Sequence, residues 1–363
     1  MSKSRVLVVG LIAAGLIAHG GSSKAAGPYI PFHGVYWLTS QPSGLPAYSY
    51  VNETAGRVNL TVIGPSELGD AGLMQRFVNN GVWFILHFSS GEKYTTPPPS
   101  GQADPGAWDY LENKNGKFVT DLTAAKASMI ASGSIQRLAG ISLDEEWYGF
   151  LNGYQPVPGG PFVYPYNSAS RYPSLAPYAA NRVAQGDALR NLLALRIADI
   201  NAAFPNAQYP NVYTVQVEVA WNDLLAYGAG WYYPPPASLD VLGIDPYFTG
   251  NVLGCDSTTK AAWDAQSGLL VQHALARFPQ PMMLVAQAFR HTPGYGWPIA
   301  PAPCQMEWWY QLAMANAARI PALMWFSYGY TDTSVAQGVR HPDHVDRWLK
   351  LIEIFDRNLA NKP

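Results

Sequence analysis

The chain of 363 residues carries 23 Lys and Arg against 25 Asp and Glu, and charged residues make up only 13% of it. This balance argues against nucleic acid as a partner, because neutralising phosphates requires clustered basic side chains and the sequence contains no basic run. The chain is instead rich in aromatic residues and turn formers, with 22 Tyr, 12 Trp, 33 Gly and 30 Pro. That profile is typical of a compact exported protein with long, aromatic loops.

The first residues have the layout of a secretory signal. Lys3 and Arg5 precede an apolar run over residues 6–18, and small residues follow around Ala25. The run is shorter than the roughly 20 residues that span a bilayer, although a short membrane anchor is the alternative. We therefore expect cleavage of residues 1–25, a secreted or periplasmic location, and no stable membrane association after cleavage.

Short runs of β-branched and aromatic residues alternate with helical patterns along the rest of the chain. We expect strands over residues 34–38, 58–64, 82–88, 138–146, 212–220, 239–247, 282–289 and 322–328. We expect helices over residues 68–80, 119–136, 178–204, 260–278, 305–320 and 344–359. Such alternation implies parallel strands joined by crossovers. Residues 26–363 are thus predicted to form one α/β domain, a (β/α)8 TIM barrel acting as a monomer. A doubly wound sheet is the alternative, but no Gly-rich phosphate loop follows the first strand.

Two segments too long for simple connections, residues 89–117 and 148–177, follow the third and fourth strands and are rich in Pro and aromatic residues. In a TIM barrel, the loops that follow the strands meet at one end, where the active site is built. Cys255 and Cys304 follow the sixth and seventh strands. In an exported chain these two cysteines are expected to form a disulfide, which would join neighbouring loops at the same rim.

The fourth predicted strand combines an apolar face with an acidic one. Ile141 and Leu143 point to one side, whereas Ser142, Asp144 and Glu146 point to the other. Buried carboxylates are costly without partners, so this strand end is predicted to open into a solvated cleft. The alternative is that the acids cap the next element or pair with an Arg.

The remaining strand ends contribute acids, amides and aromatics but no metal-ligand spacing. The predicted candidates are Trp37, His87, Glu218, Trp221, Asp245, Tyr247, Gln287 and Trp325. Such a set suits glycoside cleavage, in which one carboxyl group protonates the leaving oxygen and a second group stabilises the oxocarbenium-like centre. Neither a cofactor nor a metal is expected, and the stretch from His341 to His344 is interpreted as the start of the last helix.

Several of these residues also have a structural interpretation. Glu218 could be a polar residue of the barrel core, paired with an Arg, and an ion pair is the role we expect for Glu145. Asp245 could fix the turn before the proline that follows it. His87 could be a core histidine, and Trp325 could fill the barrel.

The stretch from Gly140 to Glu146 resembles the strand-four signature of glycoside hydrolase family 18, written D-G-x-D-x-D-x-E. Asp144 and Glu146 match its last two acids, whereas Ala139 and Ser142 stand where the signature has its first two.

Two further segments are similar to that family. Leu323-Met-Trp325 resembles its strand-eight segment, and Tyr247 its strand-six tyrosine, although the pattern around Tyr247 differs. The sixth and seventh strands are more similar to TIM-barrel glycosidases in general.

The resemblance implies two possible mechanisms. In the chitinase-like one, Glu146 is the general acid, Asp144 tunes it, Tyr247 binds an N-acetyl group, and the amide of the substrate is the nucleophile. In the two-carboxylate one, Glu146 remains the acid and a second carboxylate assists it.

That second carboxylate would be Glu218 or Asp245. Retaining barrels usually carry the nucleophile on the seventh strand, where this sequence has Gln287.

The predicted function is therefore that of a secreted glycoside hydrolase acting on a polysaccharide or oligosaccharide. The alternative is a carbohydrate-binding pseudoenzyme, in which Gln287 marks the loss of catalysis. An esterase or lyase is a third possibility, but the sequence has no G-x-S-x-G nucleophile elbow to support it.

Overall fold

The computed structural model describes residues 28–36, 49–88, 110–143, 182–218, 235–247, 254–291, 300–326 and 336–363. Within them, parallel strands form a closed barrel in the order β1-β2-β3-β4-β5-β6-β7-β9. These strands are β1 Phe32–Tyr36, β2 Leu60–Ile63, β3 Trp83–Phe88, β4 Leu138–Leu143, β5 Tyr213–Glu218, β6 Val241–Ile244, β7 Met282–Gln287 and β9 Ala322–Phe326. The last strand pairs with the first, with Val35 opposite Trp325. The predicted (β/α)8 barrel is confirmed.

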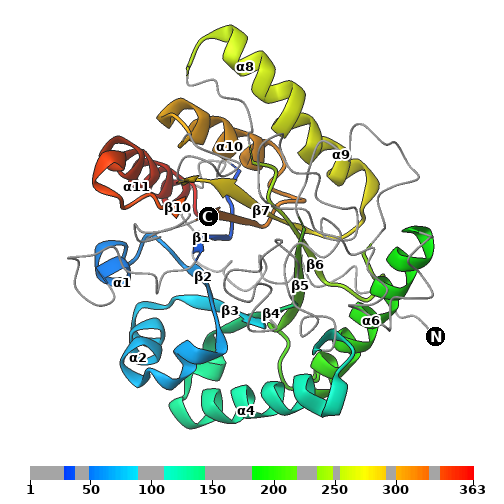
Figure 1. Cartoon of the computed structure of the whole chain (residues 1–363). Helices are drawn as coiled ribbons and strands as arrows, with labels where there is room; N and C mark the ends of the chain where they lie inside the picture. The colour runs from blue at the N-terminus through cyan, green and yellow to red at the C-terminus, as the bar shows by residue number, and fades with distance from the viewer. Residues whose placement is uncertain are drawn as a thin grey trace, which may run out of the picture.

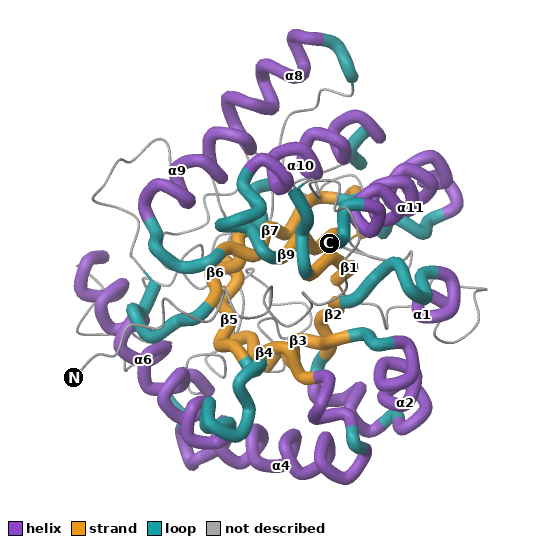
Figure 2. The backbone as a smooth tube through the Cα atoms, turned by 180° about the vertical axis from the view of Figure 1, so that it is seen from behind, coloured by secondary structure: helices purple, strands orange, loops and turns teal. Residues whose placement is uncertain are grey.

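Helices surround the ring of strands, as Figure 1 and Figure 2 show from opposite sides. They are α1 Ser49–Glu53, η2 Pro65–Gly69, α2 Ala71–Asn80, η3 Lys114–Gly116, α4 Lys117–Ser132, η4 Ser134–Arg137, α6 Arg182–Ala203, α8 Ser257–Trp263, η7 Asp264–Gly268, α9 Leu269–Arg277, α10 Pro303–Ala315, η8 Pro342–His344 and α11 Val345–Ala360. All the predicted helices overlap described ones. Among the described helices, none has the length and apolar character needed to cross a membrane.

Two helical regions differ from the sequence-based expectation. The short helix α1 follows the first strand, where no helix is predicted. The helix predicted over residues 260–278 consists of α8, a π-helical turn η7 and α9. Gly268 lies in that turn, and a Cβ there would be 3.4 Å from the ring of Trp263. The indole therefore packs directly against the widened turn.

Apolar side chains form two separate layers. The inner layer comes from strands alone and fills the barrel: Tyr36, Leu60, Val62, Ile85, Ala139, Val215, Val217, Met283, Val285, Ala322 and Met324. The outer layer lies between the other strand faces and the helices. It contains Ile141 from a strand and Phe355 from a helix, for example. The barrel interior is therefore a packed core rather than a pore, and residues at the strand ends are the ones placed to contact a ligand.

The direction of side chains corrects two predictions. In β5, Val215 and Val217 point into the barrel, whereas a site role for Glu218 requires the alternate positions of this strand to face inward. In β9, Met324 and Phe326 belong to the inner layer, whereas Trp325 is fully buried in the outer layer. The expectation that Trp325 lines the site is therefore wrong. Strands covered on both faces are apolar throughout and carry no readable alternation.

A β-bulge in β4 sets the direction of its last residues. Phe84 of β3 pairs with Leu138 and Ile85 pairs with Gly140, so Ala139 is the extra residue. Because side chains alternate with a period of two, removing this residue would turn every later side chain of β4 to the other face. With the bulge, the apolar face of β4 packs in the outer layer, as predicted.

Beyond the barrel, β8 Arg290–His291 and β10 Ala336–Gln337 form a small antiparallel sheet. It joins the segment that follows β7 to the segment that precedes η8. An ion pair of 3.2 Å also joins Arg290 of β8 to Asp343 of η8.

Candidate active site

The carboxyl ends of the strands define the mouth of the barrel, and β3 and β4 contribute a polar pair to it. His87 and Ser142 are register partners, each one residue before the end of its strand. The His87 Nδ1 atom lies 3.3 Å from the Ser142 hydroxyl oxygen. Both side chains alternate with outer-layer neighbours and are buried, so they lie on the inner face. His87 therefore points inward, whereas its role as a sugar ligand stays a prediction.

Four aromatic rings occupy the part of the mouth formed by the consecutive strands β6, β7, β9 and β1. The Phe326 ring centroid lies 5.7 Å from that of Tyr36, 6.2 Å from that of Tyr247 and 5.1 Å from that of Phe289. Tyr247 and Phe289 also meet edge to face at 5.1 Å. Aromatic pairs favour such edge-on contacts, which fix the rings relative to one another. We call these four residues the aromatic wall.

The end of β6 carries a buried acid. Asp245 follows Ile244 of the outer layer, so it continues on the inner face. Tyr247 donates its backbone N–H to the Asp245 carbonyl at 2.8 Å, which closes a three-residue turn around Pro246. The ring of Pro246 fixes the φ angle that such a turn needs. The turn thus holds the acid and the tyrosine in a defined relation at the mouth.

The end of β7 carries a buried amide. Met283 and Val285 belong to the inner layer, so Gln287, two residues further on, points the same way. Its side chain donates to the Phe289 carbonyl at 3.1 Å. Gln287 is also the register partner of Phe326 in β9. The amide therefore lies among residues of the aromatic wall.

The mouth thus combines aromatic rings with polar side chains, since Asp245 and Gln287 lie beside the aromatic wall and His87 and Ser142 lie on β3 and β4. The strands that lead into the aromatic wall are contiguous in the closed ring, and β3 and β4 lie in the remaining half. A ligand at this end of the barrel would lie near both aromatic rings and hydrogen-bonding groups. Pockets that combine an apolar surface with a few placed polar groups are typical of small-molecule sites.

Comparisons with known proteins identify the fold. No protein-family model matches the sequence, and no curated protein matches it. A modular endo-β-1,4-mannanase of glycoside hydrolase family 26 from Cellulomonas fimi has a TM-score of 0.52 at 14% identity, over 92% of this chain and 70% of that one. A family 26 β-mannanase from Bacteroides ovatus has a TM-score of 0.53 at 12% identity, over 92% and 89% of the two chains. Both solved structures share the barrel fold with this chain.

A β-D-glucuronidase from Dictyoglomus thermophilum is a further similar structure, with a TM-score of 0.50 and 10% identity over 91% of this chain and 51% of that one. The resemblance predicted from the sequence is therefore confirmed at the level of the barrel fold. The particular likeness to family 18 stays a prediction.

Several predicted site residues lie outside the described part of the chain. These are Trp37, Asp144, Glu145, Glu146 and Trp221. Glu218 is the last residue of β5, and its side chain also lies outside the described part. Their catalytic or binding roles stay predictions.

The structure brings four of the predicted residues to the inner face near the mouth. They are His87, Asp245, Tyr247 and Gln287. They come from the ends of β3, β6 and β7, which the closed ring of parallel strands brings to the same end of the barrel.

Sequence reasoning missed three members of the aromatic wall. Tyr36 adjoins the predicted Trp37, and Phe326 adjoins the predicted Trp325, so in both cases the error is one position along a strand. For Phe289 we find no sequence pattern that would have selected it.

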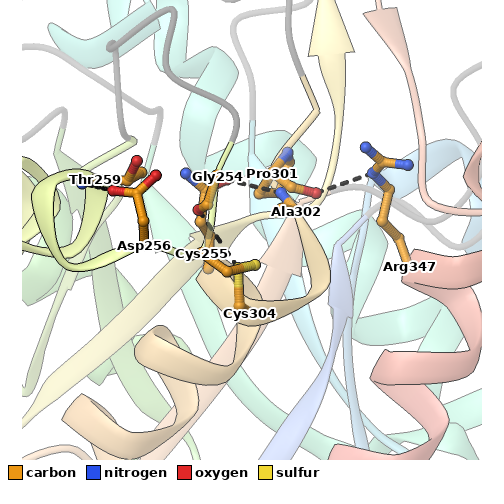
Figure 3. The surroundings of a disulfide bond; sticks show 9 residues. Gly254, Cys255, Asp256, Thr259, Pro301, Ala302, Cys304 and Arg347 are labelled. Carbon is orange, nitrogen blue, oxygen red and sulfur yellow. Dashed lines mark hydrogen bonds between the residues drawn. A yellow bond between two sulfur atoms is a disulfide. The ribbon is translucent and has the colours of Figure 1, made fainter.

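The predicted disulfide is confirmed between Cys255 and Cys304, whose Cα atoms are 5.8 Å apart (Figure 3). It joins the segment that leads into α8 to the first turn of α10. Arg347 of α11 also donates to the Pro301 carbonyl at 2.9 Å, close to Cys304 in the sequence (Figure 3). The segment that enters α10 is therefore fastened from both sides.

The stretch from His341 to His344 begins the last helical region, as predicted. His341 accepts a hydrogen bond from the Asp343 backbone N–H at 3.2 Å. The His344 Nδ1 atom donates to the Gly338 carbonyl at 2.8 Å. Burial lowers the pKa of His344 to about 4, so its ring is uncharged at neutral pH. In the part of the chain that the structure describes, no three His, Cys, Asp or Glu side chains are grouped as a metal site would require.

Proposed function

We propose that the protein is an exported glycoside hydrolase with Glu146 as its general acid. The observation that carries this proposal is the combination of aromatic and polar side chains at the mouth of the barrel. The aromatic wall offers rings for the C–H surface of a sugar, and β4, which carries Ser142, leads directly into the predicted acids. Leu143 ends β4 in the outer layer, and Asp144 and Glu146 follow it in the sequence. Catalytic residues of TIM-barrel enzymes come from such strand ends.

Asp245 is the second carboxylate that the described geometry favours. It is buried on the inner face at the end of β6, two residues before Tyr247 of the aromatic wall. Glu218 becomes the weaker candidate, because the described part of β5 turns Val215 and Val217 inward.

The partner of Glu146 is then Asp245, Glu218 as the weaker candidate, or a group on the substrate. Gln287 cannot supply the second carboxylate, because its side chain is an amide. Both the two-carboxylate mechanism and the substrate-assisted one therefore remain to be tested.

Reducing-sugar release from a panel of polysaccharides tests the proposal. The panel contains mannan, β-linked glucans, galactan and chitin oligosaccharides. Glu146→Gln removes the proton donor and is expected to lower kcat at least about a hundredfold. Glu145→Gln is the matched control, because the neighbouring side chain is expected on the other face of the strand, and it should retain activity. Full activity in Glu146→Gln would reject the assignment.

Asp245→Asn separates the two mechanisms. If Asp245 is the second carboxylate, the variant loses activity about as strongly as Glu146→Gln does, on every substrate. If the substrate supplies the assisting group, the variant keeps most of its kcat on chitin oligosaccharides, whose N-acetyl groups can take that role. Unfolding midpoints of both variants check that they remain folded.

A carbohydrate-binding protein without catalysis is the second candidate function, and the amide of Gln287 at the end of β7 is the observation that favours it. Calorimetric titration with the same glycans distinguishes the two. Binding with no product release by the wild-type protein would support the binding protein and reject the hydrolase.

The location of the protein is the remaining part of the proposal. The disulfide supports an oxidising compartment, because such bonds persist mainly in exported proteins. Mass spectrometry of the protein recovered from the culture medium or periplasm is expected to show a new N-terminus close to Ala26. An intact Met1 in the recovered protein would contradict cleavage.

A further inference from the structure

The aromatic wall consists of two buried rings and two half-buried ones. Tyr36 and Phe289 are each 1% exposed, whereas Tyr247 and Phe326 are half-buried. The Phe289 ring packs edge to face against both half-buried rings, with a centroid distance of 5.1 Å in each case. A ligand at the mouth would therefore contact Tyr247 and Phe326, and Phe289 is the buried ring that supports both of them.

The side chain of Gln287 holds the backbone of Phe289. Its amide N–H donates to the Phe289 carbonyl at 3.1 Å, and Gln287 is itself only 2% exposed. This bond spans the point where the chain leaves the barrel, because β7 ends at Gln287 and β8 begins at Arg290. Breaking such a bond is costly, since a buried carbonyl group that loses its donor is not readily rehydrated.

Neighbouring backbone pairings fix the chain on both sides of Phe289. The Ala288 N–H donates to the Phe326 carbonyl at 2.8 Å, one residue beyond the end of β7. On the other side, Arg290 begins β8, which pairs with β10. Phe289 is thus the one residue between the barrel and the small antiparallel sheet, and the Gln287 amide bonds the carbonyl at that junction.

The contact with Phe289 requires an amide at position 287 rather than a carboxylate. A carbonyl oxygen needs a donor, and an ionised carboxylate only accepts hydrogen bonds. Glu at this position would therefore bring acceptor oxygens together in a buried place. The amide of Gln287 thus has a reason in the structure that does not depend on whether the protein is catalytic.

We propose that Gln287 is a positioning residue for glycan binding. Its amide fixes Phe289, and Phe289 in turn fixes Tyr247 and Phe326, the two rings that a sugar contacts. The identity of the ligand rests on the proposed function. Because Gln287 acts on the shape of the aromatic wall, its loss should weaken binding and leave the chemical step unchanged, which raises KM but not kcat.

NMR of protein labelled with ¹³C-tyrosine tests the positioning without any ligand. The Tyr247 ring signal is assigned by its loss in Tyr247→Phe. Phe289→Leu removes the ring that meets Tyr247 edge to face and should therefore shift this signal. Gln287→Met keeps the length of the side chain but has no donor, so it should shift the signal in the same direction. A Tyr247 signal that stays at its wild-type position in Gln287→Met would overturn the proposal.

Kinetics on the glycan that the wild type degrades fastest test the consequence for binding. Gln287→Met should raise KM about fivefold, as expected for one misplaced aromatic contact, and leave kcat within about twofold. Phe289→Leu should have the same effect. Because both changes act on one ring, the double variant should also show about a fivefold increase, not the roughly 25-fold increase expected for independent sites. Multiplied effects would show that Gln287 contacts the ligand itself and would overturn the proposal.

A second glutamine provides the matched control. Gln305 is also buried, and its side chain also bonds a backbone group, the Ala302 N–H at 2.7 Å, but it lies on α10 outside the ring of strands. Gln305→Met should therefore leave KM unchanged even where it lowers the unfolding midpoint. An increase in KM as large as that of Gln287→Met would show a general effect of losing a buried hydrogen bond and would contradict the proposal.

Gln287→Glu separates positioning from lost catalysis. This variant also lacks a donor when ionised, so it should shift the Tyr247 signal and raise KM without raising kcat. A higher kcat would show that position 287 is the place of a missing nucleophile, and the proposal would then be wrong.

The two readouts fail separately from the proposed function. A protein that binds no glycan rejects the proposed function, whereas the Tyr247 signal still decides whether Gln287 fixes the aromatic wall. If the protein binds glycans without cleaving them, Kd from calorimetric titration replaces KM in the same comparison. Glycan cleavage with a KM that is insensitive to Gln287→Met keeps the hydrolase and rejects the role of Gln287.

Discussion

His33 of β1 and Asn358 of α11, 325 residues apart in the sequence, share a hydrogen bond of 2.9 Å in the buried interior. The Asn358 amide group also donates to the Ile30 carbonyl at 3.0 Å and accepts from the Ile30 N–H at 3.1 Å. The His33 Nε2 atom donates to the Arg57 carbonyl. This network fastens the first strand of the barrel to its last helix with both polar atoms of the Asn358 amide engaged.

Replacing Asn358 with Leu is therefore expected to destabilise the protein by about 3 kcal/mol. The variant leaves both backbone groups of Ile30 and one nitrogen of His33 buried without this partner, and each such group costs about 1–3 kcal/mol. Urea unfolding followed by tryptophan fluorescence measures the effect. Asn79→Leu is the control, because Asn79 is exposed on α2 and should change stability by less than about 0.5 kcal/mol. Equal midpoints for the two variants would contradict the network.

Stability should fall as the pH is lowered from about 7 to about 4. Burial lowers the pKa of His33 to about 4 and that of His344 to about 4, below the ordinary value of 6.5. The unfolded chain therefore binds more protons than the folded one between these pH values, which favours unfolding. The difference between the pKa of His33 in the unfolded and folded chain corresponds to a loss of about 3 kcal/mol of unfolding free energy at low pH. His344 adds a loss of the same sign.

Unfolding free energies measured at about pH 7 and about pH 5 test this dependence. At about pH 5 the histidines are protonated in the unfolded chain, where their pKa is near 6.5, but still largely neutral in the folded chain, where it is about 4. In His33→Gln, which has no titrating ring at this position, the loss between the two pH values should be clearly smaller than in the wild type. The other titrating side chains are the same in both proteins, so the difference isolates His33. An unchanged loss would show that another group is responsible.

Removal of the disulfide should destabilise the protein. Cys255 and Cys304 are separated by 49 positions, and opening a loop of this length costs about 4 kcal/mol in the chain-entropy model. The double variant Cys255→Ser with Cys304→Ser is expected to lose up to this amount of unfolding free energy. Treating the wild type with a reducing agent is the matched control and should lower the midpoint to a similar value. No change in either sample would contradict a structural role.

Gly34 stands where β2 leaves no room for a side chain on β1. A Cβ at this position would lie 1.6 Å from the Leu60 carbonyl oxygen, a backbone atom that cannot move aside without displacing β2. Gly34→Ala is therefore expected to cost about 3 kcal/mol or more, as overpacking does in a tight core. Gly69→Ala is the control, because nothing lies within 4 Å of its added Cβ. Thermal unfolding of both variants decides the point, and similar midpoints would show that the strands can separate.

The sequence predicts the barrel well because each strand and each helix is indicated by the residue types within its own short segment, and their alternation then indicates the fold. The direction of side chains is predictable only where the two faces of a strand differ. In β4, Ile141 and Leu143 alternate with Gly140 and Ser142, and the pattern indicates the correct faces. In β9, every residue from Ala322 to Phe326 is apolar, because one face fills the barrel and the other packs under helices.

The inward face of β5 could not be predicted, because a polar residue of this strand has its partner far along the sequence. Thr214 is buried on the face away from the barrel axis, where its N–H and its hydroxyl each donate to the Asp240 carboxylate at 2.9 Å. In the sequence alone, polar side chains on one face of a strand indicate a cleft. The partner of Thr214 precedes the next strand, and no local pattern reports such a pairing.

Two adjacent aromatic residues of β9 are expected to have opposite effects when replaced. Trp325 is fully buried in the outer layer, so Trp325→Leu leaves a cavity and should destabilise the protein by about 3 kcal/mol. Phe326 is half-buried in the aromatic wall, so Phe326→Leu should cost less stability but remove a ring from the mouth. Stacking contributes about 1 kcal/mol, which predicts a KM for glycan about fivefold higher. Unfolding midpoints and KM values of both variants are measured together. If Trp325→Leu changed KM more than Phe326→Leu did, the inner face of β9 would be wrongly assigned.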